Sequence, residues 1–389
     1  MKRILIEFYS KRTPENLLSL LKEPFDGAVF FCFTDTSPEE RVRHQLSRVI
    51  ERLCGWRPVF HVIREKTLEA ALATLDSMEK GVLYTVDLTG GEAALLAAAG
   101  YFAHKREGVC LHQYDVRTGK LLFSYPEMPK PSPCPFHLDA ESYLTMSGSA
   151  PLRVPRHHFN RGPLKEEILR LWNAVRRNLS DWNGFCSLPS GEGDDKCRLD
   201  RKYAGRRDSA KQSLKRITDR LARAGIIRDL KETAENGKLS MEFTLNVPDE
   251  AKFLYDKAGN LLEMYAALAA HEAGIFHDLC VGVEVDWNGI REKHHTPDPR
   301  NEIDLFFMRE DLPVVGSCKN TFPKNDYLYE IAVMAGHYGG FYATPLLVSS
   351  FSATPTVRKR AAEMGVLLLD SLSTLPFSRA VDFFKRNFK

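Results

Sequence analysis

Short hydrophobic runs alternate with amphipathic stretches through the first part of the chain. Five runs rich in β-branched and aromatic residues have the length of buried strands, and they lie at 4–8, 28–33, 59–63, 82–86 and 109–114. Between them, apolar residues recur with helical spacing, notably over 38–53 and 92–104. Strands that alternate with helices form parallel sheets covered by helices. The pattern therefore predicts an α/β, doubly wound domain over residues 1–145.

A change in composition separates this domain from the rest. Residues 126–155 are rich in proline and lack periodicity. Beyond them the pattern predicts two helices and a hairpin, at 164–179, 214–221, 226–230 and 239–245. Asn236-Gly237 between the last two runs is a strong turn signal. A helix followed by a hairpin predicts a winged-helix-like linker module over 146–247, which leaves 248–389 as a C-terminal domain.

The C-terminal domain opens with a helix and a strand that both carry carboxylates. Apolar spacing predicts a helix over 251–270, with Glu263 on a face of small residues. The strand that follows, 281–287, places Glu284 on the face opposite its valines. Because small residues let a sheet approach closely, Glu263 is expected at a helix–sheet contact instead of in bulk solvent.

Four polar residues lie on the hairpin that comes next. The hairpin is predicted by two apolar runs around a turn, at 303–308, 312–316 and 309–311. Side chains alternate faces along a strand, so Glu302 and Asp304 share one face of the first strand, and Ser317 and Lys319 share one face of the second. A register that pairs even-numbered with odd-numbered positions brings all four together.

An acidic cluster beside a lysine suits phosphodiester hydrolysis. Carboxylates bind Mg²⁺ or Mn²⁺, while an ammonium group contacts a phosphate or a polarised water. The alternative is a surface hairpin with an ordinary cross-strand Glu/Lys pair. The proximity of Glu263 and Glu284 in the same segment favours the metal site.

The order of these motifs resembles the PD-(D/E)xK nuclease superfamily. The resemblance is carried by Gly259-Asn-Leu-Leu-Glu263, Asn301-Glu-Ile-Asp304, Ser317-Cys-Lys319 and Leu328-Tyr-Glu330. These motifs are similar to those of one branch, the CRISPR-associated ancillary nucleases that join an N-terminal CARF domain to this restriction-endonuclease-like fold. The resemblance implies that Glu263 and Asp304 are metal ligands, that Lys319 is the catalytic lysine, and that Mg²⁺ or Mn²⁺ is the cofactor.

Ser317 departs from the superfamily pattern, which has a carboxylate at this position. Glu302, Glu284 or Glu330 could supply the missing metal ligand. Alternatively, serine and water suffice, or the site is weakened. The sequence leaves these possibilities open.

Two loops of the N-terminal domain have the chemistry of a phosphate site. One follows the first predicted strand and the other follows the fourth, and ligands of doubly wound sheets bind where such loops lead into helices. Glycines allow close backbone approach, and hydroxyl, amide and ammonium groups can bind phosphate oxygens. The candidate ligand-binding residues are Ser10, Lys11, Thr13, Asn16, Thr89, Gly90 and Gly91.

The Thr-Gly-Gly segment resembles that of CARF domains, which are Rossmann-like sensors of cyclic oligoadenylates. A structural turn is the alternative for so short a motif. Many relatives continue the glycine pair with a threonine and a lysine, whereas this chain has Glu92 and Ala93. Phosphate neutralisation then falls to Lys11, Arg12 or a cation elsewhere. No Walker A or G-x-G-x-x-G motif is present, which disfavours an NTPase or a dinucleotide enzyme.

Composition and charge fit a globular protein of several domains. The chain has 389 residues, of which 43% are hydrophobic and 27% charged. The sequence shows neither a secretory signal nor an apolar run long enough to span a membrane, so a cytoplasmic protein without a membrane partner is expected. Eight cysteines lack any CxxC pair, which argues against zinc ribbons and a disulfide framework. Cys318 is expected to be a buried thiol on the face opposite the carboxylates.

One stretch is strongly basic although the whole chain is not. Residues 198–228 hold 11 Lys and Arg against 3 Asp and Glu, while the net charge of the chain is only +3. Such a helix can follow a phosphate backbone. A solvated charged face is the alternative, because Tyr203 is the stretch's only aromatic residue.

The resemblance implies a homodimeric, metal-dependent nuclease of CRISPR antiviral defence that is activated by a cyclic oligoadenylate, with cyclic tetra-adenylate expected. The nucleic-acid substrate, DNA or RNA, single- or double-stranded, stays open, as does degradation of the activator by the first domain. The alternative function is a ligand-responsive nucleic-acid-binding regulator whose nuclease domain is inactive.

Overall fold

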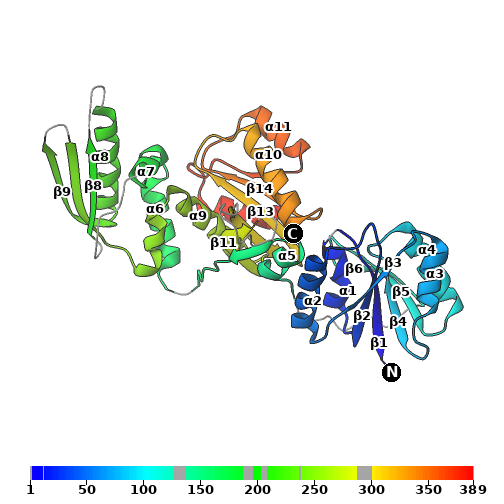
Figure 1. Ribbon diagram of the computed structural model, residues 1–389. Coiled ribbons are helices and arrows are strands. Elements are labelled where there is room, and N and C mark those ends of the chain that lie inside the picture. Colours follow the sequence, from blue (N-terminus) through cyan, green and yellow to red (C-terminus); the bar gives the residue numbers. More distant parts are fainter. Residues whose placement is uncertain are drawn as a thin grey trace.

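Three sheets divide the chain into three parts. The structure is a computed structural model, and it describes residues 2–11, 13–126, 137–160, 162–186, 196–202, 208–235, 238–286 and 300–388. Two sheets have six strands and one has three. Figure 1 shows the C-terminal sheet between the N-terminal sheet and the small sheet. Among the described residues, no helix has the length and apolar character needed to cross a membrane.

The N-terminal sheet has the order β3-β2-β1-β4-β5-β6. Its strands are β1 (Arg3–Phe8), β2 (Gly27–Phe33), β3 (Val59–Ile63), β4 (Leu83–Asp87), β5 (Val109–Asp115) and β6 (Lys120–Tyr125). The first five are parallel and confirm the five predicted strands, whereas β6 is antiparallel to β5 and was not predicted. The strand order reverses between β1 and β4. Loops at such a reversal form the usual ligand crevice of open α/β sheets.

Helices cover this sheet because their apolar stripes face it. They are η1 (Thr13–Asn16), α1 (Leu18–Lys22), α2 (Glu40–Cys54), α3 (Leu68–Asp76) and α4 (Ala93–Lys105). The predicted helices 38–53 and 92–104 are thereby confirmed within two residues at each end. α2 ends at Gly55, whose φ of 80° terminates the helix in the left-handed conformation.

The small sheet is antiparallel, with the order β8-β10-β9. This part consists of α6 (Leu164–Val175), α7 (Leu179–Cys186), β8 (Lys196–Lys202), α8 (Asp208–Arg223), β9 (Ile227–Glu235) and β10 (Lys238–Leu245). The predicted helix 164–179 ends early, at Val175, and α7 begins after a break. The predicted hairpin is confirmed by the β9–β10 pairing. Asn236, Gly237 and Tyr203 lie outside the described residues.

The C-terminal sheet has the order β15-β14-β13-β12-β11-β7. Its elements are α5 (Ala140–Met146), β7 (Ala150–Arg153), η2 (Asp249–Tyr255), α9 (Ala258–Ala273), β11 (Asp278–Asp286), β12 (Arg300–Arg309), β13 (Leu312–Lys319), α10 (Asn325–Met334), η3 (Ala335–Gly339), β14 (Thr344–Ser349), α11 (Pro355–Glu363), β15 (Leu367–Leu369) and α12 (Phe377–Asn387). β7 falls inside the stretch predicted as linker, 146–247, yet it pairs with β11. The structure therefore places residues 150–153 in the C-terminal sheet.

The helix predicted over 251–270 is two elements in the structure. Lys257 is extended, with φ −135° and ψ 139°, so η2 and α9 cannot be continuous. α9 is buried along most of its length, against the sheet on one side and against α6 and α12 on the other. This burial fixes where Glu263 points.

Candidate active site and ligand loops

The β12–β13 hairpin holds the polar residues predicted to lie together. Its turn has two residues, Glu310 and Asp311, with φ of 44° and 69°. Two successive positive φ angles characterise the tight turns that suit the twist of a hairpin. The ladder pairs Leu305 with Gly316 and Arg309 with Leu312. Even positions therefore face odd positions, which confirms the predicted register.

Asp304 is held between the two strands. Its Oδ2 accepts hydrogen bonds from the Cys318 amide at 2.6 Å and from the Ser317 hydroxyl at 3.2 Å. Burial nevertheless raises the pKa of Asp304 above its usual value. Ser317, the position that departs from the nuclease pattern, thus orients Asp304. Cys318 has a raised pKa, mainly through burial, as expected for a thiol that does not act as a nucleophile.

Glu263 approaches the hairpin from α9. A Cβ at Gly259 would lie 2.9 Å from the Oε1 of Glu263, so this glycine makes room for the carboxylate one turn away. Burial raises the pKa of Glu263 to about 8, and repulsion by Asp304 and then by Glu302 adds to the shift. The structure therefore brings the two predicted metal ligands close enough for the charge of Asp304 to help raise the pKa of Glu263.

Lys319 lies at the end of β13, three-quarters buried. Its Nζ is 3.3 Å from the Oε1 of Glu330 in α10 and 5.3 Å from the centre of the Tyr327 ring. The positive charge of Lys319 acts on the carboxylates of both Glu263 and Asp304, whose pKa values it lowers in opposition to burial. Glu330 thus positions the lysine.

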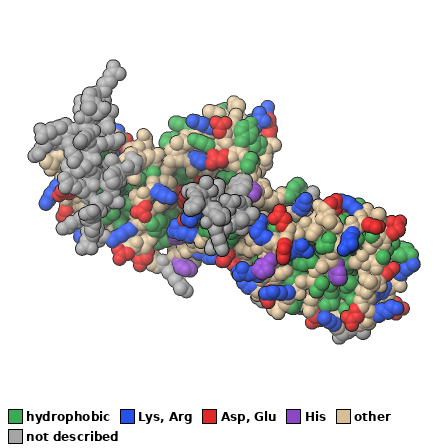
Figure 2. All heavy atoms as spheres, in the orientation of Figure 1, with side chains coloured by type: hydrophobic (Ala, Val, Ile, Leu, Met, Phe, Trp, Pro, Cys, Tyr) green, Lys and Arg blue, Asp and Glu red, His purple; other side chains and the backbone are tan. Residues whose placement is uncertain are grey.

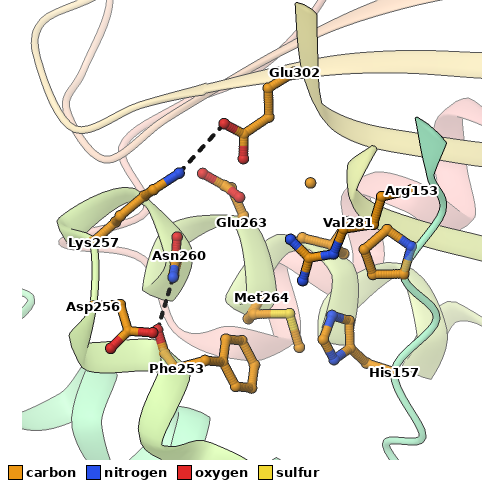
Figure 3. A pocket seen from close by; sticks show the side chains of 12 residues that line it. Arg153, His157, Phe253, Asp256, Lys257, Asn260, Glu263, Met264, Val281 and Glu302 are labelled. Atoms are coloured by element: carbon orange, nitrogen blue, oxygen red, sulfur yellow. Dashed lines mark hydrogen bonds and ion pairs between the residues drawn. The ribbon is translucent and has the colours of Figure 1, made fainter. Parts of the chain in front are cut away.

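The remaining candidate ligands differ in position. Glu302 and Glu284 are cross-strand partners on β12 and β11. Glu302 lines a cavity together with Glu263 and lies 3.5 Å from the Nζ of Lys257, whereas Glu284 is 3.3 Å from Arg153. Figure 3 shows the Glu302 and Glu263 carboxylates side by side. Of the two, Glu302 is therefore the better placed to replace the carboxylate missing at position 317.

Taken alone, these side chains do not form a finished metal site. Nowhere in the part of the chain that the structure describes are three or more His, Cys, Asp or Glu side chains grouped as metal ligands. The pair Glu263 and Asp304 nevertheless fits a divalent ion, because two partly buried carboxylates with raised pKa values gain from a cation between them.

The two N-terminal loops meet at the strand-order reversal between β1 and β4. A Cβ at Gly90 would lie 2.9 Å from the Oε2 of Glu15 and 3.2 Å from the Cβ of Ser10, so the loops touch. Thr89 accepts a hydrogen bond from the Tyr114 amide, and its own amide donates to Asp87. The loop after β4 is thereby fixed as an Asx-turn.

Some of the predicted ligand residues have structural roles as well. The side-chain oxygen of Asn16 accepts a hydrogen bond of 2.8 Å from the Ser10 amide, and its side-chain nitrogen donates one of 2.7 Å to the Ser10 carbonyl. Gly91 has a φ of 102°, and a Cβ there would lie 2.4 Å from Phe8. Glycine is therefore required at 91 by the fold itself. Thr13 begins η1, Lys11 is exposed, and Arg12 lies outside the described residues.

Lys66 is a cation that sequence reasoning missed. Its Nζ is 2.5 Å from Glu92 and 3.1 Å from Asp35. Glu92 is the residue before α4, the helix that follows the Gly-Gly pair. Lys66, in the loop between β3 and α3, thus lies beside the start of α4, where it is paired with two carboxylates.

The basic helix α8 uses part of its charge in ion pairs. Arg216 binds Asp181 of α7 at 3.0 Å, and Lys215 lies 3.1 Å from Glu232 of β9. Arg220 and Arg223 are exposed. Elsewhere Figure 2 shows basic and acidic side chains intermingled on the visible face of the N-terminal domain.

The fold is similar to two solved structures along nearly its whole length. Protein VC1899 from Vibrio cholerae is 17% identical with a TM-score of 0.73, and the match covers 99% of this chain and 98% of that one. Can2 from Sulfobacillus thermosulfidooxidans, in complex with cyclic tetra-adenylate, is 15% identical with a TM-score of 0.65, and the match covers 98% and 99%. No family model and no curated protein matches the chain. At these identities the likeness establishes a common fold.

Proposed function

We propose that this protein is a metal-dependent nuclease of CRISPR antiviral defence that a cyclic oligoadenylate activates. The observation that carries the proposal is the partly buried pair Glu263 and Asp304, both with raised pKa values, beside Lys319. Helix and paired strands deliver these residues in the order of the PD-(D/E)xK motifs. The fold shared with Can2, whose structure holds cyclic tetra-adenylate, supports the choice of activator.

Glu263, Asp304 and Glu302 would hold the metal. A bound Mg²⁺ or Mn²⁺ would neutralise charge on the scissile phosphate and lower the pKa of its bound water. Neighbouring groups of the chain hold the proposed catalytic side chains in position. The Cys318 amide fixes Asp304, while Glu330 and the Tyr327 ring hold the Lys319 ammonium group where it can contact a phosphate oxygen.

The activator would bind at the two loops between β1 and β4. Lys11 and Lys66 would neutralise its phosphates, and the amides at the start of α4 add a favourable dipole. A cyclic ligand with repeated phosphates matches a pair of such sites, so we propose that two chains form a homodimer around it. The exposed arginines of α8 are proposed to contact the nucleic-acid substrate.

One observation favours a second candidate function. Ser317 replaces an expected carboxylate, and no three-ligand group is present among the described residues. A ligand-responsive nucleic-acid-binding regulator with an inactive nuclease domain would have these features.

A cleavage assay separates the two functions. Single- and double-stranded DNA and RNA are incubated with the protein and Mg²⁺ or Mn²⁺, with and without cyclic tetra-adenylate. The nuclease proposal expects cleavage that requires the metal and is stimulated by the cyclic nucleotide. Binding of the substrates without cleavage under every condition would support the regulator.

A further inference from the structure

A cavity of about 350 Å³ opens directly beside the candidate active site. Its size is within the range of about 300–1,000 Å³ typical of small-molecule sites. Glu263 and Glu302 form one side, while Arg153 and His157 form the other, and Phe253 and Met264 lie below the two carboxylates in the view of Figure 3. The cavity therefore joins the metal-site carboxylates to a surface that the catalytic proposal does not use.

Aromatic rings form part of this surface. The rings of His157 and Phe253 stack with their centres 5.2 Å apart and their planes 19° apart. Both are partly exposed, and both line the cavity. The Asn260 side chain donates a hydrogen bond of 2.7 Å to the Phe253 carbonyl, which fixes η2 and its ring against the first turn of α9.

Two cations flank the rings. Arg153 and Lys257 have side chains that are 67% and 68% exposed, and each is more than 3 Å from the carboxylate it faces. Exposed ion pairs of this kind contribute little to stability, so the cations are available to a phosphate at small cost. One cavity is thus surrounded by aromatic rings that can stack on a planar base, by cations that can bind a phosphate, and by carboxylates that can bind a metal.

We propose that this cavity binds the base of one unpaired nucleotide next to the bond that is cut. The base packs against the His157–Phe253 stack, and the adjoining phosphates reach Arg153, Lys257 and the carboxylates. A base can enter such a cavity only when it has left its own stack and pair. Stacking on an aromatic ring accepts every base, so the site selects for an unpaired nucleotide and not for a sequence.

The inference rests on the proposed nuclease function. Its test uses two readouts, so that failure of the base site can be distinguished from failure of the nuclease function. The substrates are a series of single-stranded oligonucleotides with one abasic position each. From one oligonucleotide to the next, that position moves by one nucleotide across the mapped cleavage site. Cleavage by the full-length protein is measured with Mn²⁺ and cyclic tetra-adenylate, and binding is measured by fluorescence anisotropy. We expect one abasic position beside the cut to lower kcat/KM and affinity about tenfold or more.

Substitutions connect that loss to the rings. In Phe253→Leu and His157→Leu, the intact oligonucleotide should already be cut and bound more weakly, and the abasic position should cost little more. Phe383→Leu is the matched control, because it removes a half-buried ring from α12 of the same domain without lining the cavity. Melting temperatures show whether the variants fold.

Each outcome has a distinct meaning. Equal cleavage and binding of intact and abasic strands, or an undiminished abasic effect in folded Phe253→Leu, would overturn the base site while leaving the nuclease function standing. Binding that needs the base and Phe253, without cleavage of any strand, would uphold the base site and reject the nuclease.

Discussion

Tyr342 donates a hydrogen bond of 2.7 Å to Glu15, and this bond joins the C-terminal domain to a candidate ligand loop of the N-terminal domain. The other oxygen of the same carboxylate lies against Gly90, where a Cβ would approach it to 2.9 Å. Around the bond, Leu18 and Tyr114 of the N-terminal domain pack with Leu312 of β13. The Glu15 carboxylate therefore contacts both the candidate activator site and the C-terminal domain, whose activity the activator would control.

A second contact links the same domains. Lys22 in α1 lies 3.6 Å from Asp311, which is buried in the turn of the β12–β13 hairpin. That hairpin carries Asp304 and Lys319. A ligand activates a distant site only if it prefers one of two arrangements of the protein. A shift of η1 and α1 on ligand binding would reach the strands that carry Asp304 and Lys319 directly through this contact.

The first prediction tests this route with Tyr342→Phe. The change keeps the ring and removes the hydrogen bond to the Glu15 carboxylate, so we expect stimulation by cyclic tetra-adenylate to change by about tenfold or more. Binding of the activator and of Mn²⁺ should stay close to normal. Stimulated and unstimulated cleavage rates are compared, with Tyr329→Phe on the exposed face of α10 as control. Unchanged stimulation would show that the hydrogen bond between Tyr342 and Glu15 does not couple activator binding to cleavage.

The second prediction concerns the catalytic groups. Asp304→Ala and Lys319→Ala should abolish cleavage while the protein still folds and binds the activator. Asp304→Ala should also lose the rise in melting temperature that Mn²⁺ causes in the wild type, since a ligand that binds only the folded state stabilises it. Asp382→Ala and Lys359→Ala, on helices α12 and α11, are the controls. Full activity of Asp304→Ala, with contaminating nucleases excluded, would refute the assignment.

The third prediction follows from the raised pKa of Glu263. With a pKa of about 8 in the metal-free protein, this carboxyl is mostly protonated at pH 7. A metal ion binds the deprotonated form, so binding releases a proton below pH 8. Apparent Mn²⁺ affinity should therefore rise with pH and level off above about 8.

Calorimetry in buffers with different ionisation enthalpies measures the released proton at pH 7 and at pH 9. We expect close to one proton at the lower pH and fewer at the higher pH. In Glu263→Gln the pH dependence should largely disappear together with most of the affinity. Proton release that is the same at both pH values would contradict the proposed role of Glu263.

The fourth prediction concerns Lys66 and Lys11, the lysines proposed to neutralise the phosphates of the activator. Lys66→Ala and Lys11→Ala should each weaken binding of cyclic tetra-adenylate, and the effect should shrink at high salt because exposed charges are screened. Titration of the labelled activator at two salt concentrations measures this. Lys80→Ala, an exposed lysine elsewhere in the same domain, is the control. Normal binding by both variants would show that the activator binds at another surface.

The sequence predicted the features that depend on local periodicity. β-branched runs located the five parallel strands, and the alternation of faces predicted the register that brings Asp304 next to Ser317. The predicted strands also located the loops after β1 and β4, because each loop begins where its strand ends.

Features that depend on distant contacts escaped prediction. Apolar spacing continues from η2 into α9, so the extended Lys257 that separates them could not be recognised. The stack of His157 on Phe253 joins segments nearly a hundred residues apart, and Tyr342 is 327 positions from Glu15. No pattern within a short window specifies such pairs.

The last prediction concerns a buried acid in the N-terminal domain. Glu7 is fully buried in β1, and its pKa is raised well above the usual value by burial, then by repulsion from Asp87 and Glu15. In the unfolded chain this carboxyl ionises from a pH of about 4.3 upward, whereas in the folded protein it stays protonated. The unfolded state therefore binds fewer protons, and stability falls as the pH rises through this window.

Glu7→Gln should remove that loss, because an amide is neutral in both the folded and the unfolded state. We expect the variant to gain in melting temperature relative to the wild type between pH 5 and pH 8, by an amount that corresponds to at most about 1.4 kcal/mol per pH unit. Glu69→Gln on the exposed face of α3 should show no such gain. A parallel pH dependence in Glu7→Gln and wild type would mean that Glu7 is ionised in the folded protein, and the N-terminal domain would then need a cation beside it.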